Sequence, residues 1–426
     1  MLQILLFSFA SAQVNLDDRA QVAQFGAAVA ANALQYYTGA PGGDGQGAVL
    51  PNSSPDASGI QWYESGIYWN AVLDHVRSSK NQQTGNVAST ALGLASNGNV
   101  GSFLGANSAL AAALQGKWND DILWYALAAV AGAEIYGKDA VMPGGLTFLK
   151  VAQNTYDEAW QQWDTTQCGG GIFWSRDRSS SNAAQRGYKS TITNAQHIML
   201  GARLYALTNN ATYIANGRLV AQWLRGSGII KSDSAVADGV TAVGNGCTLN
   251  TVELSYKAGM LAGALSLLAQ VSSDQEYLSV ARSITATALT TFNKNGIISD
   301  ACEPNCKPNE VQAKGTMISG LGYFATITTN AQDKAQVTGA LKASLAAMIT
   351  NCDSKASCGS YWADRVGGSN FHYQTNALML VNAYQMAVNG ISTDKLSAPK
   401  DTSTTKNGAS QVSMVSLAAL LVISLL

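Results

Sequence analysis

Charged residues are scarce in this chain, and several familiar motifs are missing. Only 12% of the 426 residues are charged, and 26 basic against 27 acidic residues leave a net charge of −1. No lysine or arginine cluster follows the pattern of a phosphate backbone, so we expect no nucleic-acid partner. The chain has only three histidines and lacks the G-x-S-x-G and H-E-x-x-H motifs, so neither a serine hydrolase nor a zinc enzyme is indicated. We therefore expect no metal and no other cofactor.

The N-terminal end is typical of an exported protein. A short apolar run ends in an A-x-A pattern at residues 10–12, which predicts a signal peptide over residues 1–12. Two N-x-S/T sequons, at Asn52 and Asn210, predict N-linked glycosylation, which also takes place in the secretory pathway.

The C-terminal end has the pattern of a signal for a glycosylphosphatidylinositol (GPI) anchor. Small residues around Asn407 precede a polar spacer and an apolar tail, which is shorter than the roughly 20 residues that a membrane-spanning helix needs. We expect GPI attachment at Asn407, removal of residues 408–426, and a Ser/Thr/Lys-rich linker over residues 391–407. A weak C-terminal membrane anchor is the alternative.

Six cysteines agree with export, because disulfides form in the secretory pathway. Six cysteines allow about 15 pairings, and the sequence does not choose among them. The simplest arrangement closes two local loops and leaves one long-range pair: Cys302 with Cys306, Cys352 with Cys358, and Cys168 with Cys247. A metal site at the first of these loops is the alternative, but no C-x2-C pair or nearby histidine supports it.

Segments with helical periodicity recur through residues 13–390, and no set of alternating strands is evident. Helices that are apolar on nearly every side, such as KAGMLAGALSLLA, alternate with amphipathic ones, such as YLSVARS. The first kind must be buried on every side, and it recurs about every 55 to 75 residues, the length of a helical hairpin. We predict an all-α fold in which inner and outer helices close into a single-domain α/α barrel. A linear α-solenoid is the alternative.

Two adjacent aspartates, Asp120 and Asp121, stand at the start of the apolar stretch DILWYALAAVAGAE. They have a structural interpretation: Asn119 caps a helix, and the two acids face the positive end of its dipole. They also have a chemical one, because glycoside hydrolysis needs one protonated and one ionised carboxyl group. Neighbours on a helix point about 100° apart, but in a first turn both side chains can project into a cavity at the end of a barrel. Their mutual repulsion would raise one pKa, as an acid catalyst needs.

The double-aspartate stretch WNDDILWYALAAVAGAE resembles the corresponding motif of the endo-α-1,6-mannanases of glycoside hydrolase family 76. The resemblance covers about residues 13–390, and the layout of signal, domain and GPI tail is similar to the fungal cell-wall branch of that family, the Dcw1/Dfg5 proteins. Where the family often has Tyr-Asn-x-Gly, this chain departs from it with Tyr-Lys-Ala-Gly at residues 256–259. Further matching stretches, in the order that the family shows, lie at residues 62–74, 169–177, 188–208 and 359–365.

This resemblance implies an (α/α)6 barrel and a retaining mechanism with Asp120 as nucleophile and Asp121 as acid/base. The implied substrate is α-1,6-linked mannose, in α-mannan or a GPI glycan, during cell-wall biogenesis. Either water or a wall glucan would accept the mannosyl group, since hydrolysis and transglycosylation use the same two residues. We expect a monomer that reaches the membrane through a GPI lipid. A non-catalytic wall-glycan-binding protein on the same fold is the alternative.

Seven other residues are candidates for substrate binding. Four are aromatic residues in loops or at helix ends, where they either stack on a sugar ring or line the barrel wall: Tyr63, Trp118, Trp174 and Trp362. Asn194 and Gln374 begin apolar helices, so they either cap these helices or bind sugar. Glu64 is either a ligand for a sugar hydroxyl or a buried, hydrogen-bonded structural acid.

Overall fold

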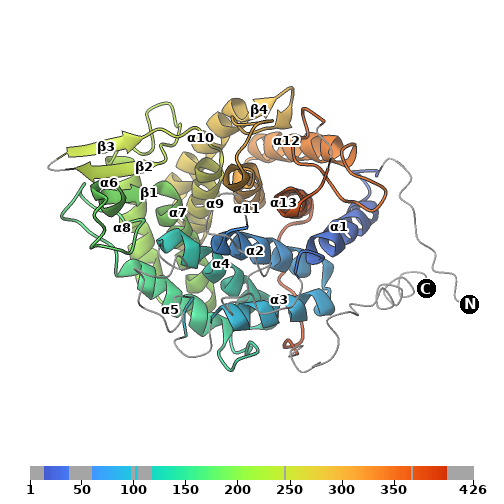
Figure 1. Cartoon of the computed structure of the whole chain (residues 1–426), viewed down its shortest axis with the longest axis horizontal. Helices are drawn as coiled ribbons and strands as arrows, with labels where there is room; N and C mark the ends of the chain where they lie inside the picture. The colour runs from blue at the N-terminus through green and yellow to red at the C-terminus, as the bar shows by residue number, and fades with distance from the viewer. Residues whose placement is uncertain are drawn as a thin grey trace, which may run out of the picture.

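The computed structural model describes residues 14–37, 60–96, 101–103, 118–243, 246–365 and 368–400. The long helices in this part of the chain form two concentric rings (Figure 1). The inner ring consists of α2 (Trp62–Ser79), α4 (Asn119–Tyr136), α7 (Thr191–Thr208), α9 (Tyr256–Ser272), α11 (Ala313–Ile327) and α13 (Phe371–Asn389). The outer ring consists of α1 (Arg19–Leu34), α3 (Gln82–Ala95), α5 (Phe148–Trp160), α8 (Thr212–Gly226), α10 (Gln275–Thr291) and α12 (Ala331–Ile349).

The inner ring is closed. Each inner helix packs against the next one along the chain, and α13 packs back against α2. The chain passes from an outer helix to an inner one six times, so the predicted (α/α)6 barrel is confirmed and the linear solenoid is excluded.

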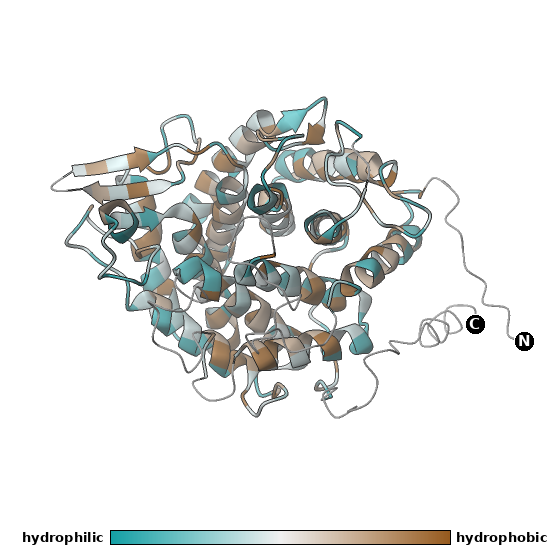
Figure 2. Ribbon diagram, in the orientation of Figure 1, coloured by the Kyte–Doolittle hydropathy of each residue, from teal (hydrophilic) through white to brown (hydrophobic). Residues whose placement is uncertain are grey.

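The two kinds of helix in the sequence correspond to the two rings. Nearly every residue of the inner helix α4 is buried. The outer helix α5 buries only one face, at the spacing of a single helical stripe: Phe148, Val151, Ala152, Thr155, Tyr156 and Ala159. Apolar residues accordingly run along helices of both rings (Figure 2).

Glycines allow the inner helices α9 and α11 to approach closely. A Cβ atom on Gly320 would lie 1.9 Å from the carbonyl oxygen of Gly259, and one on Gly259 would lie 2.3 Å from the Cα atom of Met317. Both distances are far below contact distance and involve backbone atoms, so any larger residue would push the two helices apart. Gly259 belongs to the Tyr-Lys-Ala-Gly stretch, so its place in that stretch has a packing reason.

A small antiparallel sheet has the strand order β1-β2-β3; β1 leads directly into α7, and β3 precedes α9 in the chain. Ser190 pairs with Gly239, and Ala242 pairs with Cys247. These strands, the two-stranded sheet and the short helices have the following bounds: β1 (Tyr188–Ser190), β2 (Gly239–Val243), β3 (Gly246–Asn250), β4 (Asn293–Lys294), β5 (Ile297–Ile298), α6 (Ala183–Gly187) and the 3-10 helix η1 (Pro308–Glu310).

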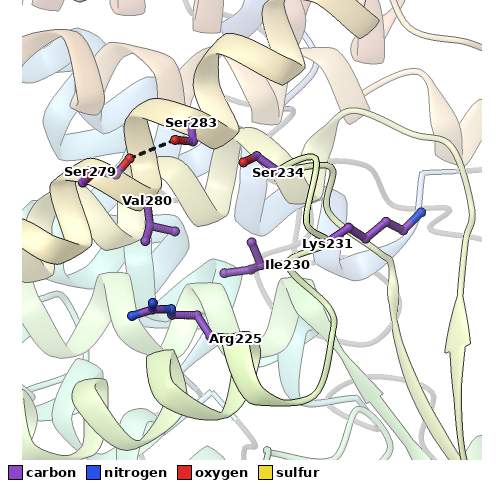
Figure 3. Close-up of a pocket in the computed structure, with 7 residues that line it drawn as sticks. All are labelled: Arg225, Ile230, Lys231, Ser234, Ser279, Val280 and Ser283. Carbon is purple, nitrogen blue, oxygen red and sulfur yellow. Dashed lines mark hydrogen bonds between the residues drawn. The ribbon is translucent and has the colours of Figure 1, made fainter.

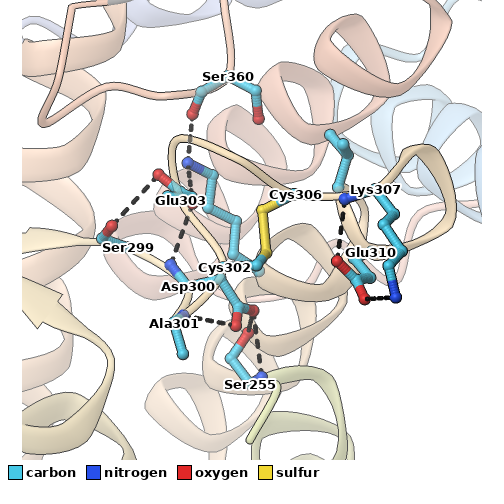
Figure 4. Close-up of a disulfide and its surroundings, with 12 residues drawn as sticks. Ser255, Ser299, Asp300, Ala301, Cys302, Glu303, Cys306, Lys307, Glu310 and Ser360 are labelled. Carbon is cyan, nitrogen blue, oxygen red and sulfur yellow. Dashed lines mark hydrogen bonds and ion pairs between the residues drawn. A yellow bond between two sulfur atoms is a disulfide. The ribbon is translucent and has the colours of Figure 1, made fainter.

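All six cysteines are paired, and the predicted pairing is confirmed. The disulfides join Cys168 to Cys247, Cys302 to Cys306, and Cys352 to Cys358. The long-range bond ties β3 to the loop before α6. The two local bonds close loops that precede α11 and α13 (Figure 4 shows the first).

The segment after α13 packs against the barrel. The backbone N–H of Leu396 donates to the carbonyl of Ile135 at 2.9 Å, and that of Lys400 donates to Oδ1 of Asn86 at 3.1 Å. Residues 391–400, which the sequence places in a linker, therefore contact α4 and α3. Within the described residues, no helix is both long enough and apolar enough to cross a membrane.

Several predicted features lie outside the described residues, namely the signal peptide, the Asn52 sequon, Asn407 and residues 408–426. Asn210 is described, and it is exposed just before α8. Its glycosylation stays a prediction.

His197 provides a test of the buried interior. It lies on α7, is fully buried, and stacks on Tyr156 with ring centroids 3.9 Å apart. Burial lowers its pKa from 6.5 to about 3. The unfolded chain therefore takes up a proton between pH 6.5 and about 3 that the folded chain does not, so the free energy of unfolding falls as the pH falls through this window.

We expect His197→Phe to reduce this loss of stability in acid, because phenylalanine keeps the stacking and does not titrate. Between pH 7 and pH 4 the variant should lose about 2 to 3 kcal/mol less unfolding free energy than the parent protein. Urea unfolding at both pH values measures this difference. Equal losses in the two proteins would show that His197 does not titrate in this way.

Candidate active site

The first turns of the six inner helices gather at one end of the barrel, because each inner helix is followed by an antiparallel outer one. Specific contacts show this convergence. Oε1 of Glu64, on α2, lies 3.1 Å from Nε2 of His372, on α13. The charge of Glu64 also acts on Asp121, on α4. Residues from distant parts of the sequence therefore surround the aspartate pair.

Asp120 and Asp121 lie in the first turn of α4, as the sequence predicts, but Asn119 does not cap this helix. The helix begins at Asn119, and the capping position belongs to Trp118. The buried side-chain amide of Asn119 instead donates to the carbonyl of Phe173 at 2.7 Å and accepts from Arg176 at 2.7 Å. The predicted cap is thus wrong: Asn119 joins α4 to the loop at residues 173–176.

A second Asp-Asp pair, Asp17 and Asp18, shows what a purely structural role looks like. Oδ1 of Asp18 accepts from the backbone N–H groups of Ala20 and Gln21, and so caps the outer helix α1. Asp17 is exposed and pairs with Lys342 at 2.5 Å. Neither of these acids lies in a first turn of the inner ring.

Burial and like charges set the electrostatics of the Asp120–Asp121 pair. Burial raises the pKa of Asp120, and the nearby Asp238 adds to this rise, while hydrogen bonds from the Trp174 side chain and from backbone N–H groups oppose it. Burial also raises the pKa of Asp121, and here the charges of Asp120 and Glu64 add to the rise. The pair therefore retains one proton more readily than two free carboxyls would, and Asp121 is the better place for it.

Asp238 is a site residue that sequence analysis missed. It is buried just before β2, and its carboxylate accepts hydrogen bonds from the hydroxyls of Tyr188 and Tyr256. The Asp238 backbone is fixed by β-type hydrogen bonds to Thr191 and Asn250. The only sequence signal was indirect, since Tyr188 begins a stretch that resembles the family, whereas Tyr256 begins the stretch that departs from it and Asp238 belongs to neither.

The aromatic candidates divide into two groups. Trp118 and Trp174 are both partly exposed, and their rings stack with centroids 5.2 Å apart beside the aspartates. Tyr63 is also partly exposed, and Asp120 and Asp121 both raise its pKa, after the larger effect of burial. Trp362 is only 1% exposed and donates its indole N–H to Gly359 at 2.8 Å, so it belongs to the barrel wall.

Asn194 and Gln374 are completely buried and hold loops in place. The caps of α7 and α13 are Ser190 and Asn370, so neither candidate caps its helix. The amide of Asn194 exchanges two hydrogen bonds with the backbone of Ile172. The amide of Gln374 accepts from the backbone of Cys358 and donates to two other carbonyls. Their amide groups are committed to backbone partners.

Glu64 has the features of the structural interpretation, and its binding of a sugar hydroxyl stays a prediction. It is buried, and its Oε2 accepts from the backbone N–H of Gln61 at 2.7 Å, which closes a capping box at the start of α2. It is therefore a hydrogen-bonded structural acid, yet its charge faces Asp121.

A buried ion pair braces the same end of the barrel. Lys314, in the first turn of α11, pairs with Glu303 at 2.7 Å, and both side chains are almost completely buried. The lysine also donates to the carbonyl of Ser360. Asp300 in the same loop accepts from Ser255, at the start of α9. These bonds connect neighbouring inner helices through the disulfide-closed loop.

Two surface pockets lie elsewhere. One, of about 270 Å³, lies between the outer helices α8 and α10 and includes Arg225 and Lys231 (Figure 3). The other, of about 370 Å³, includes Asp74 and Asn382 near the far ends of α2 and α13. Neither contains a predicted site residue. Among the described residues, no group of three or more His, Cys, Asp or Glu side chains could hold a metal ion.

Comparisons with known proteins agree with this geometry. The family model for glycosyl hydrolase family 76 matches residues 21–395. The mannan endo-1,6-alpha-mannosidase DCW1 of Saccharomyces cerevisiae is 26% identical over 361 residues, which are 82% of this chain and 75% of that protein.

Solved structures share the fold. The crystal structure of Dfg5 from Chaetomium thermophilum in complex with glucosamine has a TM-score of 0.77 and 20% identity, covering 95% of this chain and 99% of that one. An inactive alpha-1,6-mannanase variant from a Salegentibacter species, with two consecutive aspartates changed to asparagine and alpha-1,6-mannotriose bound, has a TM-score of 0.69 and 15% identity. It covers 86% of this chain and 99% of its own. Since the family model spans nearly all of the barrel, this chain belongs to glycosyl hydrolase family 76.

Proposed function

We propose that this chain is a retaining endo-α-1,6-mannosidase or transglycosylase, in which Asp120 is the nucleophile and Asp121 the acid/base. The observation that carries the proposal is that the two carboxyl groups have different electrostatic surroundings. They are adjacent in the first turn of α4, but Asp121 faces two like charges whereas Asp120 receives hydrogen bonds that favour its anion. One ionised and one protonated carboxyl is the combination that glycoside cleavage needs.

The reaction follows from these two states. The Asp120 carboxylate attacks the anomeric carbon, while Asp121 donates its proton to the departing glycosidic oxygen. This gives a covalent mannosyl-enzyme and an ionised Asp121. Asp121 then removes a proton from an incoming hydroxyl, which attacks the same carbon and releases Asp120. The double displacement retains the anomeric configuration.

The family relatives support the substrate class. The Saccharomyces cerevisiae relative is named for action on α-1,6-mannan, and the Salegentibacter neighbour holds an α-1,6-linked mannotriose after two consecutive aspartates were changed. By analogy, the donor here is an α-1,6-mannose chain, in α-mannan or a GPI glycan. The partly exposed rings of Tyr63, Trp118 and Trp174 supply faces on which a sugar can stack.

Water and a wall glucan remain two acceptors for the same intermediate, so hydrolysis and transglycosylation differ only in what enters the second step. We also propose export and attachment through a GPI lipid at Asn407, which would hold the enzyme at the cell surface as a monomer. Three disulfides and the motifs at the two chain ends support this location.

The first test separates the roles of the two acids. Asp120→Asn should lower kcat/KM on an α-1,6-mannoside by about 10⁴-fold or more, because no covalent intermediate can form. Asp121→Asn should lose about 10² to 10⁴-fold on the same substrate. It should nevertheless accumulate the adduct on Asp120 from a mannosyl fluoride, whose leaving group needs no proton.

Intact-protein mass spectrometry after incubation with a 2-fluoro-mannosyl donor measures the adduct. Asp18→Asn is the matched control, since it changes an Asp-Asp pair that only caps α1, and it should keep full activity. Ordinary activity of folded Asp120→Asn would contradict the mechanism and favour a non-catalytic glycan-binding protein.

A second test concerns the hydrogen bond from Trp174 to Asp120. Trp174→Phe keeps a ring beside Trp118 but removes the N–H donor that favours the Asp120 anion. The pKa of Asp120 should rise, so the acid limb of the kcat/KM profile should move to higher pH by about one unit. Trp223→Phe is the matched control, because it also loses an indole hydrogen bond, but one to the carbonyl of Cys168. An unmoved acid limb in Trp174→Phe would refute the role of this bond.

A third test addresses the anchor. The mature surface protein should lack residues 408–426, because GPI attachment replaces this tail. Mass spectrometry of C-terminal peptides from membrane-bound material should find a glycolipid-linked peptide ending near Asn407. An unprocessed peptide ending in Leu426 would exclude a GPI anchor.

A further inference from the structure

The side chain of Arg176 connects three parts of the chain that meet beside the aspartate pair. Its guanidinium group donates to Oδ1 of Asn119, in the first turn of α4, at 2.7 Å. It also donates to the carbonyl oxygen of Glu158, on α5, at 3.0 Å and to Oε2 of the same residue at 3.1 Å. The side chain of Arg176 is only 6% exposed, so these bonds are largely shielded from water. A planar guanidinium group with several N–H donors is suited to hold several acceptors in fixed directions.

Asn119 carries this connection from Arg176 to the loop at residues 173–176. Its side chain is completely buried, and its amide donates to the carbonyl of Phe173 at 2.7 Å while its oxygen accepts from Arg176. The backbone N–H of Asn119 donates to the carbonyl of Trp174 at 2.8 Å. We call these bonds of Asn119 and Arg176 the latch, because they hold the loop against the start of α4.

The latch lies next to the nucleophile and to its tryptophan partner. Asp120 directly follows Asn119 in the chain, and the side chain of Trp174 forms a hydrogen bond with Asp120. The ring of Trp174 also stacks on Trp118, and Trp118 forms a β-bridge with Ser175. The position of Trp174 relative to Asp120 is therefore set by bonds that converge on Asn119.

The same loop is held on its other side by separate bonds. The side-chain amide of Asn194, on α7, exchanges two hydrogen bonds with Ile172. The backbone N–H of Trp174 donates to the carbonyl of Tyr188, in β1, at 2.8 Å. These bonds fix the loop relative to α7 and β1, whereas the latch fixes it relative to α4, the helix that carries the acids. Without the latch, the loop would stay attached to α7 but could shift away from Asp120.

We propose that Arg176 is a positioning residue, which acts through Asn119 to keep Trp174 in hydrogen-bonding contact with the nucleophile Asp120. Arg176 need not contact substrate in this role. Its donors serve a neutral amide and a backbone carbonyl as well as one carboxylate, which is an arrangement for orientation more than for charge pairing. The proposal rests on the proposed function, because it takes Asp120 as the nucleophile.

Arg176→Met tests the latch, because methionine is a long side chain without N–H donors. The rate of covalent adduct formation from a 2-fluoro-mannosyl donor should fall about 10- to 100-fold, since a small displacement of a group beside the reacting atoms has a large effect on rate. Intact-protein mass spectrometry at timed intervals measures this rate. The measurement is made well below the melting temperature, so a loss of stability alone would leave the rate per folded molecule unchanged.

A double variant tests whether Arg176 acts through Trp174. Trp174→Phe removes the indole donor that the latch holds in place. In the Trp174→Phe background, Arg176→Met should therefore slow adduct formation by less than about threefold, because both changes act through the same bond. Losses that multiply in the double variant would overturn the proposal, since Arg176 would then act by another route.

Two further variants are controls. Arg225→Met removes an arginine that pairs with Glu276 between the outer helices α8 and α10, and it should keep the parent rate. Glu158→Gln removes the charge beside Arg176 but leaves the Glu158 carbonyl and Asn119 as acceptors, so it should also stay close to the parent rate. A loss in Glu158→Gln as large as in Arg176→Met would contradict the latch and assign the effect to the ion pair.

The outcomes separate this inference from the proposed function. If the parent protein forms no adduct and cleaves no α-1,6-mannoside, the proposed function fails. If the parent is active and folded Arg176→Met forms the adduct at the parent rate, the positioning role is refuted. If Arg176→Met does not fold, Arg176→Lys decides. One ammonium group cannot hold Asn119 and Glu158 in the same two directions, so adduct formation should still slow, and a parent rate would refute the role.

Discussion

The burial of six inner helices on nearly every side is the constraint on which the rest of the structure depends. Such helices leave no face for water, so each must be surrounded by two ring neighbours and by the outer helices. Closing the ring gives each inner helix these neighbours. At Gly259 and Gly320 the backbones of α9 and α11 approach so closely that no side chain fits between them. Because the inner helices run parallel, closure also brings their first turns to one end of the barrel. Asp120 and Asp121 lie at this end, in the first turn of α4.

The treatment of buried charge differs between the two ends of the inner helices. Glu134, near the end of α4, pairs with Arg77 and Arg203, and these cations outweigh burial and lower its pKa to about 2. At the start of the same helix, the charges acting on Asp121 are both negative, so its pKa rises. The same helix, α4, thus carries two perturbed carboxyl groups. The anion of Glu134 is stabilised, whereas on Asp121 the protonated form is favoured. The first arrangement supports the fold, and the second is the kind of perturbation that catalysis uses.

The helix types, the two local disulfides and the position of the acid pair could be predicted from short stretches of sequence. The alternation of fully apolar helices, such as KAGMLAGALSLLA, with one-sided ones predicts two rings, because periodicity reports directly how many faces a helix buries. The disulfide partners Cys302–Cys306 and Cys352–Cys358 are close in sequence, so local closure was the simplest pairing. The placement of Asp120 and Asp121 in a first turn also follows from the apolar stretch behind them. The capping role of Asn119 was wrong, since a loop more than 50 residues away competes for its amide.

The sequence by itself determined the helix types and the position of the acid pair, and it favoured a ring and the two local disulfides, because each of these depends on residues close together in the chain or on a repeated local pattern. Only the tertiary structure decided which polar residues surround that pair. Asp238 lies just before β2, a strand that the helical periodicity does not reveal, and His372 reaches Glu64 from the last helix of the ring, 308 residues away. Trp362, by contrast, is removed from the site because it is buried against Lys314. These placements depend on ring closure, which packs the last inner helix, α13, against the first, α2. No single segment of the sequence indicates which residues this contact brings together.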